Sequence, residues 1–450
     1  MLKGRSVAAT TLGCKVNQAE TDSMLDMLSA AGADIVDFEE KADIYIINTC
    51  SVTNIADKKS RQMLHRAKKR NPGSIVIAAG CYVQSAKELL EQDPAVDVVI
   101  SNNRKKDITK IIYDYINVRE NNKNETSGEK KSAEYFVDIS KETEYEEMGG
   151  HVPAGHTRAY VKIQDGCNQF CSYCIIPYVR GRIRSRSEAA ILSEVSELAD
   201  AGIKEVVLTG IHISSYGKDK DNEGALIELI DAISKIKGIK RIRLGSLEPG
   251  IITEDFVRRI SANKKVCPHF HLSLQSGCDS VLKRMNRKYT REQYFEKCDM
   301  LRAAYDAPAL TTDVIVGFPG ETDAEFEDTV QYLTDLNLYE MHIFKYSPRK
   351  GTVAAAMKDQ ISPEVKNARS DVLLELAEKN KRAYERMFED KELEVLVEEV
   401  VRGEDGVYLR GHTERYMDIH INVGNISMPE SFVNSFVYVR YTQDGDILMV

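Results

Sequence analysis

Three cysteines stand close together near the middle of the chain, in the run GCNQFCSYC at residues 166–174. Three residues separate Cys167 from Cys171, and two separate Cys171 from Cys174. Thiolates are soft ligands, and three of them on one short loop suit an iron–sulfur cluster. A four-iron cluster takes four cysteines when fully ligated, so a set of three would leave one iron open to a small molecule.

The same cysteines also permit a disulfide, a zinc site or chance proximity. A disulfide would leave one thiol unpaired, and disulfides are rare in reducing compartments. A structural zinc site usually takes four ligands, with a second pair of cysteines or histidines. We favour the cluster, because three close thiols in an intracellular protein usually bind metal.

Composition limits the classes of protein that remain. The 450 residues suggest about three domains at roughly 150 residues each. The formal charge of −9 provides no global positive field, so any RNA contact must come from local basic patches. The amino terminus lacks a long apolar core with a small-residue cleavage site, and no apolar run reaches membrane-spanning length. We therefore expect a cytoplasmic protein that does not enter a membrane.

The first segment, residues 1–120, alternates apolar runs with helical patterns. This βαβα rhythm predicts an α/β domain with a parallel sheet and helices on both faces. The expected strands span 6–12, 44–47, 75–79 and 96–100, and the expected helices span 19–31, 55–70 and 86–92.

Three more cysteines occupy corresponding places in that rhythm. Cys14 follows the first expected strand, Cys50 the second and Cys81 the third. The carboxyl ends of strands line the functional edge of an open α/β sheet, so we expect these thiols to meet in space. Three unrelated buried cysteines are the alternative, since free cysteine is among the most buried residue types. The shared placement favours a second cluster.

The rest of the chain divides into three segments. Residues 121–155 are polar, then acidic, with paired glycines and a proline, and we expect a linker there. Residues 156–385 alternate strands and helices, which predicts a partial (β/α) barrel with its chemistry at the carboxyl ends of the strands. Residues 386–450 carry short strands with turn signals, which predicts a small antiparallel β-barrel. The expected barrel strands span 159–163, 205–208, 241–244, 269–274, 312–316 and 340–344.

The cysteine loop, with Tyr173 inside it, resembles the signature of the radical S-adenosylmethionine (SAM) superfamily. The longer run GCNQFCSYCIIPYVRG resembles the methylthiotransferase branch, and so do the runs LTGIHISSYG, RIRLGSLEP, HLSLQSG and VIVGFPGET. The resemblance covers nearly the whole chain. It implies a flavodoxin-like amino-terminal domain, a radical SAM barrel, and a carboxy-terminal TRAM domain of the kind that binds RNA in that family.

The resemblance also implies the cofactors, which are a pair of 4Fe-4S clusters and SAM. Cys167, Cys171 and Cys174 would hold the cluster whose open iron chelates SAM, and one electron would cleave SAM into methionine and a 5′-deoxyadenosyl radical. A second SAM in each turnover would supply a methyl group to sulfur on an auxiliary cluster. The ligands implied for that auxiliary cluster are Cys14, Cys50 and Cys81.

Polar or glycine residues follow several of the expected barrel strands. Glycines there permit close approach of backbone to a ligand, and polar groups can accept hydrogen bonds from SAM. Turn chemistry explains any single one of these residues equally well, but the set fits a SAM pocket. The residues expected to contact the cofactor are Tyr173, Gly210, Ser246, Glu248, Gln275 and Gly317.

Two further patterns need an interpretation. His269 and His271 alternate with Phe270 on an expected strand, and we expect them in the core or lining the barrel rather than binding metal. Four arginines alternate directly after the cysteine loop, which in an extended segment would place them on one side. They border the proposed site and could bind RNA phosphates, although a solvated or salt-bridged surface is equally common. These arginines are Arg180, Arg182, Arg184 and Arg186.

The amino-terminal signatures indicate a substrate within the family. LGCKVN at 12–17 and NTCSVT at 48–53 resemble the branch that acts on N6-threonylcarbamoyladenosine of tRNA, directly 3′ of the anticodon. Its members insert sulfur at adenine C2 and methylate it, giving the 2-methylthio nucleoside. The resemblance implies tRNA as a partner, an electron donor of flavodoxin or ferredoxin type and a sulfur source, and we expect a monomer.

Other functions remain open at this point. Sister branches of the family modify isopentenyladenosine in tRNA or an aspartate of a ribosomal protein. A protein of another class, a non-catalytic iron–sulfur protein that binds RNA or transfers electrons, would also carry cysteine triads. The continuous run of SAM-pocket motifs argues against that last alternative.

Overall fold

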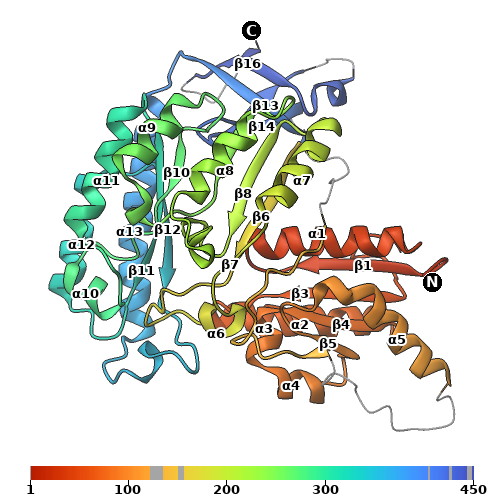
Figure 1. The fold of residues 1–450 in the computed structure, drawn as a ribbon. Helices are drawn as coiled ribbons and strands as arrows, with labels where there is room; N and C mark the ends of the chain where they lie inside the picture. Colours follow the sequence, from red (N-terminus) through yellow and green to blue (C-terminus); the bar gives the residue numbers. More distant parts are fainter. Residues whose placement is uncertain are drawn as a thin grey trace.

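The computed structural model describes residues 2–121, 135–149, 157–403, 406–424, 428–442 and 448–449 of the chain. Figure 1 shows two α/β units side by side, with an antiparallel sheet against one end of the larger unit. In the described ranges, no helix combines the length and the apolar character needed to cross a membrane.

The amino-terminal domain is a doubly wound α/β unit, as predicted. Its sheet has the order β2-β1-β3-β4-β5 with every pairing parallel, which is the flavodoxin-like order. Separate apolar clusters form on the two faces, one around Ile46 and Ile77 and the other around Tyr45 and Val76, because successive strand residues point to opposite faces. The strands are β1 (Ser6–Thr11), β2 (Asp34–Ile35), β3 (Ile44–Thr49), β4 (Ile75–Gly80) and β5 (Val98–Ile100), and the helices are α1 (Lys15–Ala30), α2 (Asn54–Arg70), α3 (Cys81–Ser85), α4 (Lys87–Gln92) and α5 (Ile108–Asn121).

The central unit is the predicted partial barrel. Strands β6, β8 and β9 pair in parallel, β10, β11 and β12 pair in parallel, and a parallel bridge between Leu247 and Leu272 joins the two sets. All six expected strands are present. They are β6 (Arg158–Asp165), β8 (Glu205–Gly210), β9 (Arg241–Leu244), β10 (His269–His271), β11 (Ala309–Val316) and β12 (Glu340–Lys345), with the short β7 (Arg184–Ser185) antiparallel to β6.

Helices cover the outer side of these strands (Figure 1). On β6, Val161 and Ile163 belong to the large apolar core shared with the helices, whereas Tyr160 and Lys162 point the other way, as the two-residue period of a strand requires. The helices are α6 (Ile176–Arg180), α7 (Glu188–Asp200), α8 (Ala225–Ser234), α9 (Glu254–Ala262), α10 (Asp279–Arg284), α11 (Arg291–Ala304), α12 (Asp323–Leu336) and α13 (Pro363–Arg386).

The carboxy-terminal segment folds as the predicted antiparallel unit. Its sheet has the order β15-β14-β13-β16-β17, and a bulge between Val397 and Glu399 bends β13. It packs against the amino ends of the barrel strands, where Arg241 donates to the backbone oxygen of His412 at 3.0 Å. The strands are β13 (Glu392–Gly403), β14 (Gly406–Thr413), β15 (Asp418–Asn422), β16 (Phe436–Arg440) and β17 (Leu448–Met449).

The expected linker is only partly described, since 122–134 and 150–156 lie outside the described residues. Its described part, 135–149, is largely exposed but is held by a few packed side chains. Tyr135 is buried in the core of the amino-terminal domain, and Tyr145 donates to the backbone oxygen of Lys162 on β6 at 3.0 Å. A polar composition did not predict this contact, because a few buried side chains suffice to hold a strap between two domains.

Candidate functional site

The cysteine loop starts where β6 ends, at the carboxyl end of the first barrel strand. Gly166 has φ of +72°, and a Cβ there would lie 1.8 Å from the backbone oxygen of Arg182, so only glycine fits. The Cys167 amide donates to the backbone oxygen of Gly181, and the Cys174 amide to that of Cys171, each at 3.0 Å. These bonds fold the loop so that its three cysteines lie near one another.

The thiols of this loop influence each other. Burial, with Cys171 adding to it, raises the pKa of Cys167 to about 11. Burial, with Cys171 and then Cys167 adding to it, raises the pKa of Cys174 to about 12. In the metal-free loop Cys167 and Cys174 therefore hold their protons at neutral pH, and metal binding must displace them.

The structure also brings Cys14, Cys50 and Cys81 together at the carboxyl edge of the amino-terminal sheet. Burial raises the pKa of Cys50 to about 11, and Cys81 and Cys14 are close enough to add to the shift. Gly13 has φ of +103°, and a Cβ there would lie 2.8 Å from Cys50 Sγ. The absence of a side chain at Gly13 thus lets the first strand end approach the second.

Both triads fit a multi-iron core better than a single ion. Thiolates around one zinc ion lie about 3.8 Å apart, since Zn–S is roughly 2.3 Å in a tetrahedral site. Within the described parts of the chain, neither cysteine triad brings its three sulfur atoms within 4.8 Å of one another. Three thiols at wider separation suit an inorganic core in which each thiolate binds a different iron.

Arg180 joins Cys14, Cys50 and Cys81, here called the assembled triad, to the barrel. It is fully buried at the end of α6, and its Nε donates to Cys81 Sγ at 3.3 Å. Its Nη1 pairs with Glu20 at 2.5 Å and Asp165 at 3.1 Å, and its Nη2 donates to Asn17. Cys81 also packs against Ile175 and Val179, so the second triad rests directly on the segment that follows the first.

Glu20 is the centre of the ionic network at this domain interface. It accepts from Lys105 of its own domain and from Lys162 of β6, the latter at 2.7 Å. Burial alone would raise the pKa of Glu20, but Arg180, Lys105 and Lys162 together hold it well below its usual range. The carboxylate therefore stays ionised inside the interface and ties α1 to the barrel.

Asn17 holds the strand ends that carry the assembled triad. Its side-chain amide donates to the backbone oxygens of Leu12 at 2.8 Å and Thr49 at 3.0 Å, while its side-chain oxygen accepts from Arg180. One side chain thus ties the ends of β1 and β3 to α6.

Arg287 contacts the set of Cys167, Cys171 and Cys174, here called the local triad, much as Arg180 contacts the assembled triad. Its Nη1 donates to Cys171 Sγ at 3.2 Å, and its Nη2 pairs with Glu248 at 2.7 Å. Sequence reasoning did not identify Arg287, which follows α10 with no recognisable motif around it. Only its place opposite the loop, more than a hundred residues away in the chain, reveals the contact.

A cavity of about 300 Å³ lies between the two triads. Tyr173 and Cys174 line it from the local triad, and Val52 and Thr53 line it from the segment after Cys50. Gln275, Asp313 and Lys345 add polar groups from the carboxyl ends of the barrel strands.

The residues expected to contact the cofactor do not all line one cavity. Tyr173 and Gln275 line the cavity between the triads, whereas Glu248 lines a neighbouring cavity of about 410 Å³ beside His212. Ser246 is exposed, and Gly210 packs 3.0 Å from Gln164 if a Cβ is added. At Gly317, which has φ of +70°, a Cβ would meet the Lys366 side chain at 2.3 Å, so this glycine serves a covered turn.

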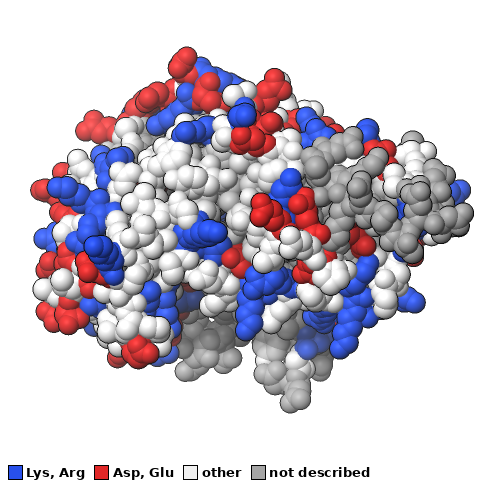
Figure 2. All heavy atoms as spheres, turned by 90° about the horizontal axis from the view of Figure 1, so that it is seen from below, with Lys and Arg blue, Asp and Glu red and all other residues white. Residues whose placement is uncertain are grey.

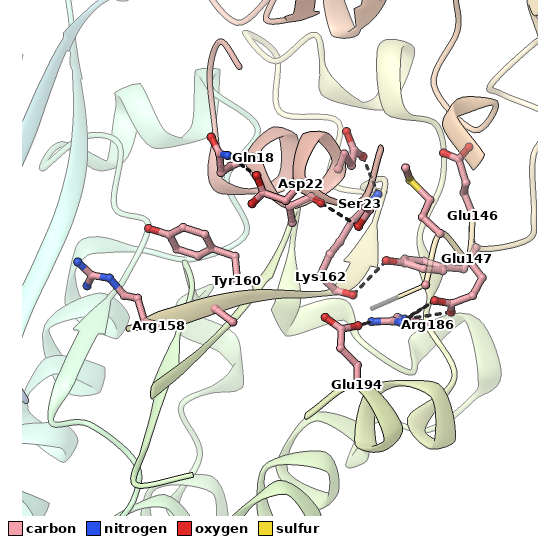
Figure 3. Close-up of a pocket in the computed structure, with 16 residues that line it drawn as sticks. Gln18, Asp22, Ser23, Glu146, Glu147, Arg158, Tyr160, Lys162, Arg186 and Glu194 are labelled. Atoms are coloured by element: carbon pink, nitrogen blue, oxygen red, sulfur yellow. Dashed lines mark hydrogen bonds and ion pairs between the residues drawn. The ribbon is translucent and has the colours of Figure 1, made fainter. Parts of the chain in front are cut away.

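The structure shows the salt-bridged alternative for three of the four arginines that follow the cysteine loop. Arg180, Arg184 and Arg186 are buried, because acidic side chains from other segments meet them. Figure 3 shows Arg186 between Glu147 and Glu194, and Arg184 lies 3.8 Å from Asp165. Arg182 alone of the four is exposed, with its guanidinium 4.4 Å from the centre of the Phe170 ring. The four arginines do not lie on one side of an extended segment, because Arg180 ends a helix and only Arg184 lies on a strand.

Figure 2 shows lysine and arginine interspersed with acidic side chains on the face seen from below, as the acidic net charge implies. On α2, Lys58, Lys59 and Lys69 are exposed, whereas Arg66 and Arg70 pair with Glu39.

The barrel strands carry a cluster of three polar side chains that sequence reasoning did not identify as a cluster. His271, Asp313 and His342, from three adjacent strands, have ligand atoms within 4.8 Å of one another. His271 lies 3.4 Å from Asp313, and its ring stacks on that of His342 at 5.8 Å. His269 and His271 line the barrel, as expected, and the missing signal was the register that aligns Asp313 with His342.

Comparisons with known proteins match the central unit and the amino-terminal domain to separate families. The radical SAM superfamily matches residues 161–333, and an uncharacterized protein family, UPF0004, matches residues 6–101. A threonylcarbamoyladenosine tRNA methylthiotransferase of Bacillus subtilis is 39% identical over 416 residues, covering 92% of this chain and 90% of that protein. One of Aquifex aeolicus is 39% identical over 413 residues, covering 92% and 96%.

A relative with another substrate is nearly as similar. A tRNA-2-methylthio-N6-dimethylallyladenosine synthase of Thermodesulfovibrio yellowstonii is 38% identical over 404 residues, covering 88% of this chain and 89% of that protein. Among solved structures, a radical SAM methyltransferase of Kitasatospora setae with cobalamin and a 4Fe-4S cluster bound has a TM-score of 0.55 at 15% identity, covering 76% of both chains. That last likeness concerns the fold alone.

Proposed function

The chain belongs to the radical SAM methylthiotransferase family, and on that premise we propose that it modifies N6-threonylcarbamoyladenosine next to the anticodon of tRNA. The proposed reaction inserts sulfur at adenine C2 and methylates it, giving the 2-methylthio nucleoside. Relatives named for this activity, at 39% identity over most of the chain, support this substrate.

The proposed ligands are Cys167, Cys171 and Cys174 for one 4Fe-4S cluster, and Cys14, Cys50 and Cys81 for the other. When bound, the clusters and SAM supply one-electron radical chemistry, a sulfur atom and a methyl group. Acid–base groups cannot easily remove a hydrogen from an unactivated aromatic carbon, which is why the reaction needs these cofactors.

The cavity between the triads carries this proposal. Side chains that follow Cys50 and side chains that adjoin Cys174 line the same space, so one bound base could meet groups held by both triads. The chain's own contribution is orientation and exclusion of water. Arg180 fixes the separation of the triads by binding Cys81 from α6, and Arg287 supports Cys171 from the opposite side.

The remaining parts of the proposal concern partners. We infer that the protein acts in the cytoplasm as a monomer, receives electrons from a protein of flavodoxin or ferredoxin type, and draws on a separate sulfur source. The described lysines of α2 and the exposed Arg182 are the candidate contacts for RNA phosphates.

Anaerobic reconstitution with iron, sulfide, SAM and a reductant tests the function directly. With tRNA that carries N6-threonylcarbamoyladenosine, nucleoside mass spectrometry should show the 2-methylthio form together with 5′-deoxyadenosine. Transfer to dimethylallyladenosine tRNA, for which a relative at 38% identity is named, or to ribosomal protein alone would assign the chain to another branch. Failure to form 5′-deoxyadenosine with any substrate would refute radical SAM activity.

A further inference from the structure

Lys15 reaches from the amino-terminal domain into the barrel. It is the first residue of α1 and follows Cys14 directly. Its ammonium nitrogen lies 5.8 Å from the ring centre of Tyr160 on β6 and 5.7 Å from that of Tyr416, between β14 and β15. Both distances are within cation–π range, so one side chain touches all three domains.

The neighbouring cations are already paired. Arg158 binds Glu398 at 2.6 Å and Arg243 binds Glu205 at 2.8 Å. Lys15, by contrast, makes no hydrogen bond or ion pair with any described residue. Lys15 is exposed as a residue, although Val16 and Asn17 beside it are buried, and burial of its ammonium group, followed by Arg158 and Arg243, lowers the pKa of that group to about 8.

Lys15 faces the region of the barrel that holds His269. Burial, followed by Arg243, Lys15, His271 and His342, holds the pKa of His269 well below its usual range, which places these groups around one region of the barrel. Of the nearby carboxylates, Glu205 pairs with Arg243 at 2.8 Å, and Asp313 lies 3.4 Å from the His271 ring nitrogen. An unpaired ammonium between two aromatic rings and two arginines favours an anion.

We propose that Lys15 binds the carboxylate of the substrate's N6 substituent. This inference rests on the proposed function and adds how the site selects its substrate. The threonylcarbamoyl group ends in a carboxylate, whereas the dimethylallyl group of the sister substrate is apolar. An apolar substituent would leave Lys15 without a partner, and the carboxylate supplies one. Overall identity does not separate the two branches, since relatives of both lie at 38–39%.

The competing explanation is that Lys15 only bridges the domains through its contacts with Tyr160 and Tyr416. The two explanations differ for a ligand whose charge is removed. Anticodon stem-loops carrying N6-threonylcarbamoyladenosine, and the same stem-loops with the carboxylate converted to a carboxamide, provide that pair. Binding of each to the cluster-loaded protein is measured without oxygen.

The wild type should bind the acid about 10 to 100 times more tightly than the amide, as expected for a hydrogen bond between charged groups. Lys15→Met keeps the aliphatic stem between the rings and removes the charge, so its acid-to-amide ratio should fall to about one. Lys15→Arg should retain most of the discrimination. The ratio is measured within each variant, so a partial loss of folded protein cancels, and iron and sulfide contents are determined alongside.

Lys204→Met is the matched comparison. The Lys204 ammonium lies 5.7 Å from the ring centre of Phe436 on β16, so this lysine also bridges two domains, but it lines neither described cavity and already donates to the backbone oxygen of Asn434. Its removal should therefore leave the ratio unchanged. Equal binding of acid and amide by the wild type, or loss of discrimination in Lys204→Met but not in Lys15→Met, would overturn the inference. A 2-methylthio product without acid-to-amide discrimination refutes only the role of Lys15. Product from the dimethylallyl RNA alone refutes the proposed function itself.

Discussion

The two cysteine triads differ in what the chain must do to build them. Cys167, Cys171 and Cys174 lie on one loop, which a glycine and backbone hydrogen bonds fold locally. Cys14, Cys50 and Cys81 follow three separate strands and meet only after the parallel sheet has formed. Each triad nevertheless receives a hydrogen bond from one buried arginine, Arg287 in the first case and Arg180 in the second.

The difference lies in where that arginine comes from. Arg287 belongs to the same domain as the loop it supports, whereas Arg180 reaches the second triad from the other domain. The assembled triad therefore depends on domain docking as well as on its own sheet. We expect perturbations of the interface to affect it far more than the local triad.

The largest expected effects come from removing one thiol of each triad. Cys171→Ala should abolish formation of 5′-deoxyadenosine, whereas Cys14→Ala should preserve it and abolish methylthiolation. Each variant should lose the iron of one cluster, about four atoms per chain. Iron analysis and product analysis under anaerobic conditions test both statements. If the two variants lose the same product and the same iron, the two clusters do not have the separate roles proposed here.

Arg180→Met should destabilise the interface by about 3–5 kcal/mol, because Glu20 and Asp165 would be left buried without a principal partner. Spectroscopy should show loss of the auxiliary cluster with the radical SAM cluster retained. Arg182→Met, at the exposed arginine two residues on, is the matched control and should change stability by less than about 0.5 kcal/mol. Simultaneous loss of both clusters in Arg180→Met would show that the triads are not independent.

The same network predicts acid sensitivity. The pKa of Glu20 and that of Asp165 are held below their usual values, so their contribution is present above the unfolded values of about 4.3 and 3.9 and is lost as pH falls further. Glu20→Gln should be less stable than the wild type by about 3 kcal/mol at pH 6, and the gap should narrow toward pH 3.5. Denaturant unfolding of the cluster-free protein measures this, and a gap independent of pH would contradict the assignment.

The smallest expected effect concerns Arg287. Replacement by lysine keeps the positive charge but loses the planar guanidinium, which binds Cys171 and Glu248 at the same time. Loss of the hydrogen bond to sulfur should shift the reduction potential of the radical SAM cluster downward by on the order of 50 mV. An EPR-monitored titration with the auxiliary cluster as internal reference gives the shift, and an equal shift in both clusters would point to a general change in the fold.

Much of the architecture was predictable because it repeats along the chain. Strand ends followed by cysteine recur three times in the first segment, and alternating strands and helices recur through the second. The positions of His269 and His271 in the barrel followed from the two-residue period of a strand. The sequence could not decide between RNA contact and salt bridges for the arginines after the loop, since the partners Glu20, Glu147 and Glu194 come from three other segments.

The sequence by itself determined the chemistry of the donor groups, the order of the folded units and the edge of each sheet where the cysteines lie, because these depend on residue type and short-range period. Only the tertiary structure decided which side chains meet. Charges pair according to distance in space, so neither the burial of Arg180 nor the unpaired ammonium of Lys15 can be read from local pattern. Both depend on how α1 docks against β6, and that docking is a property of the whole interface.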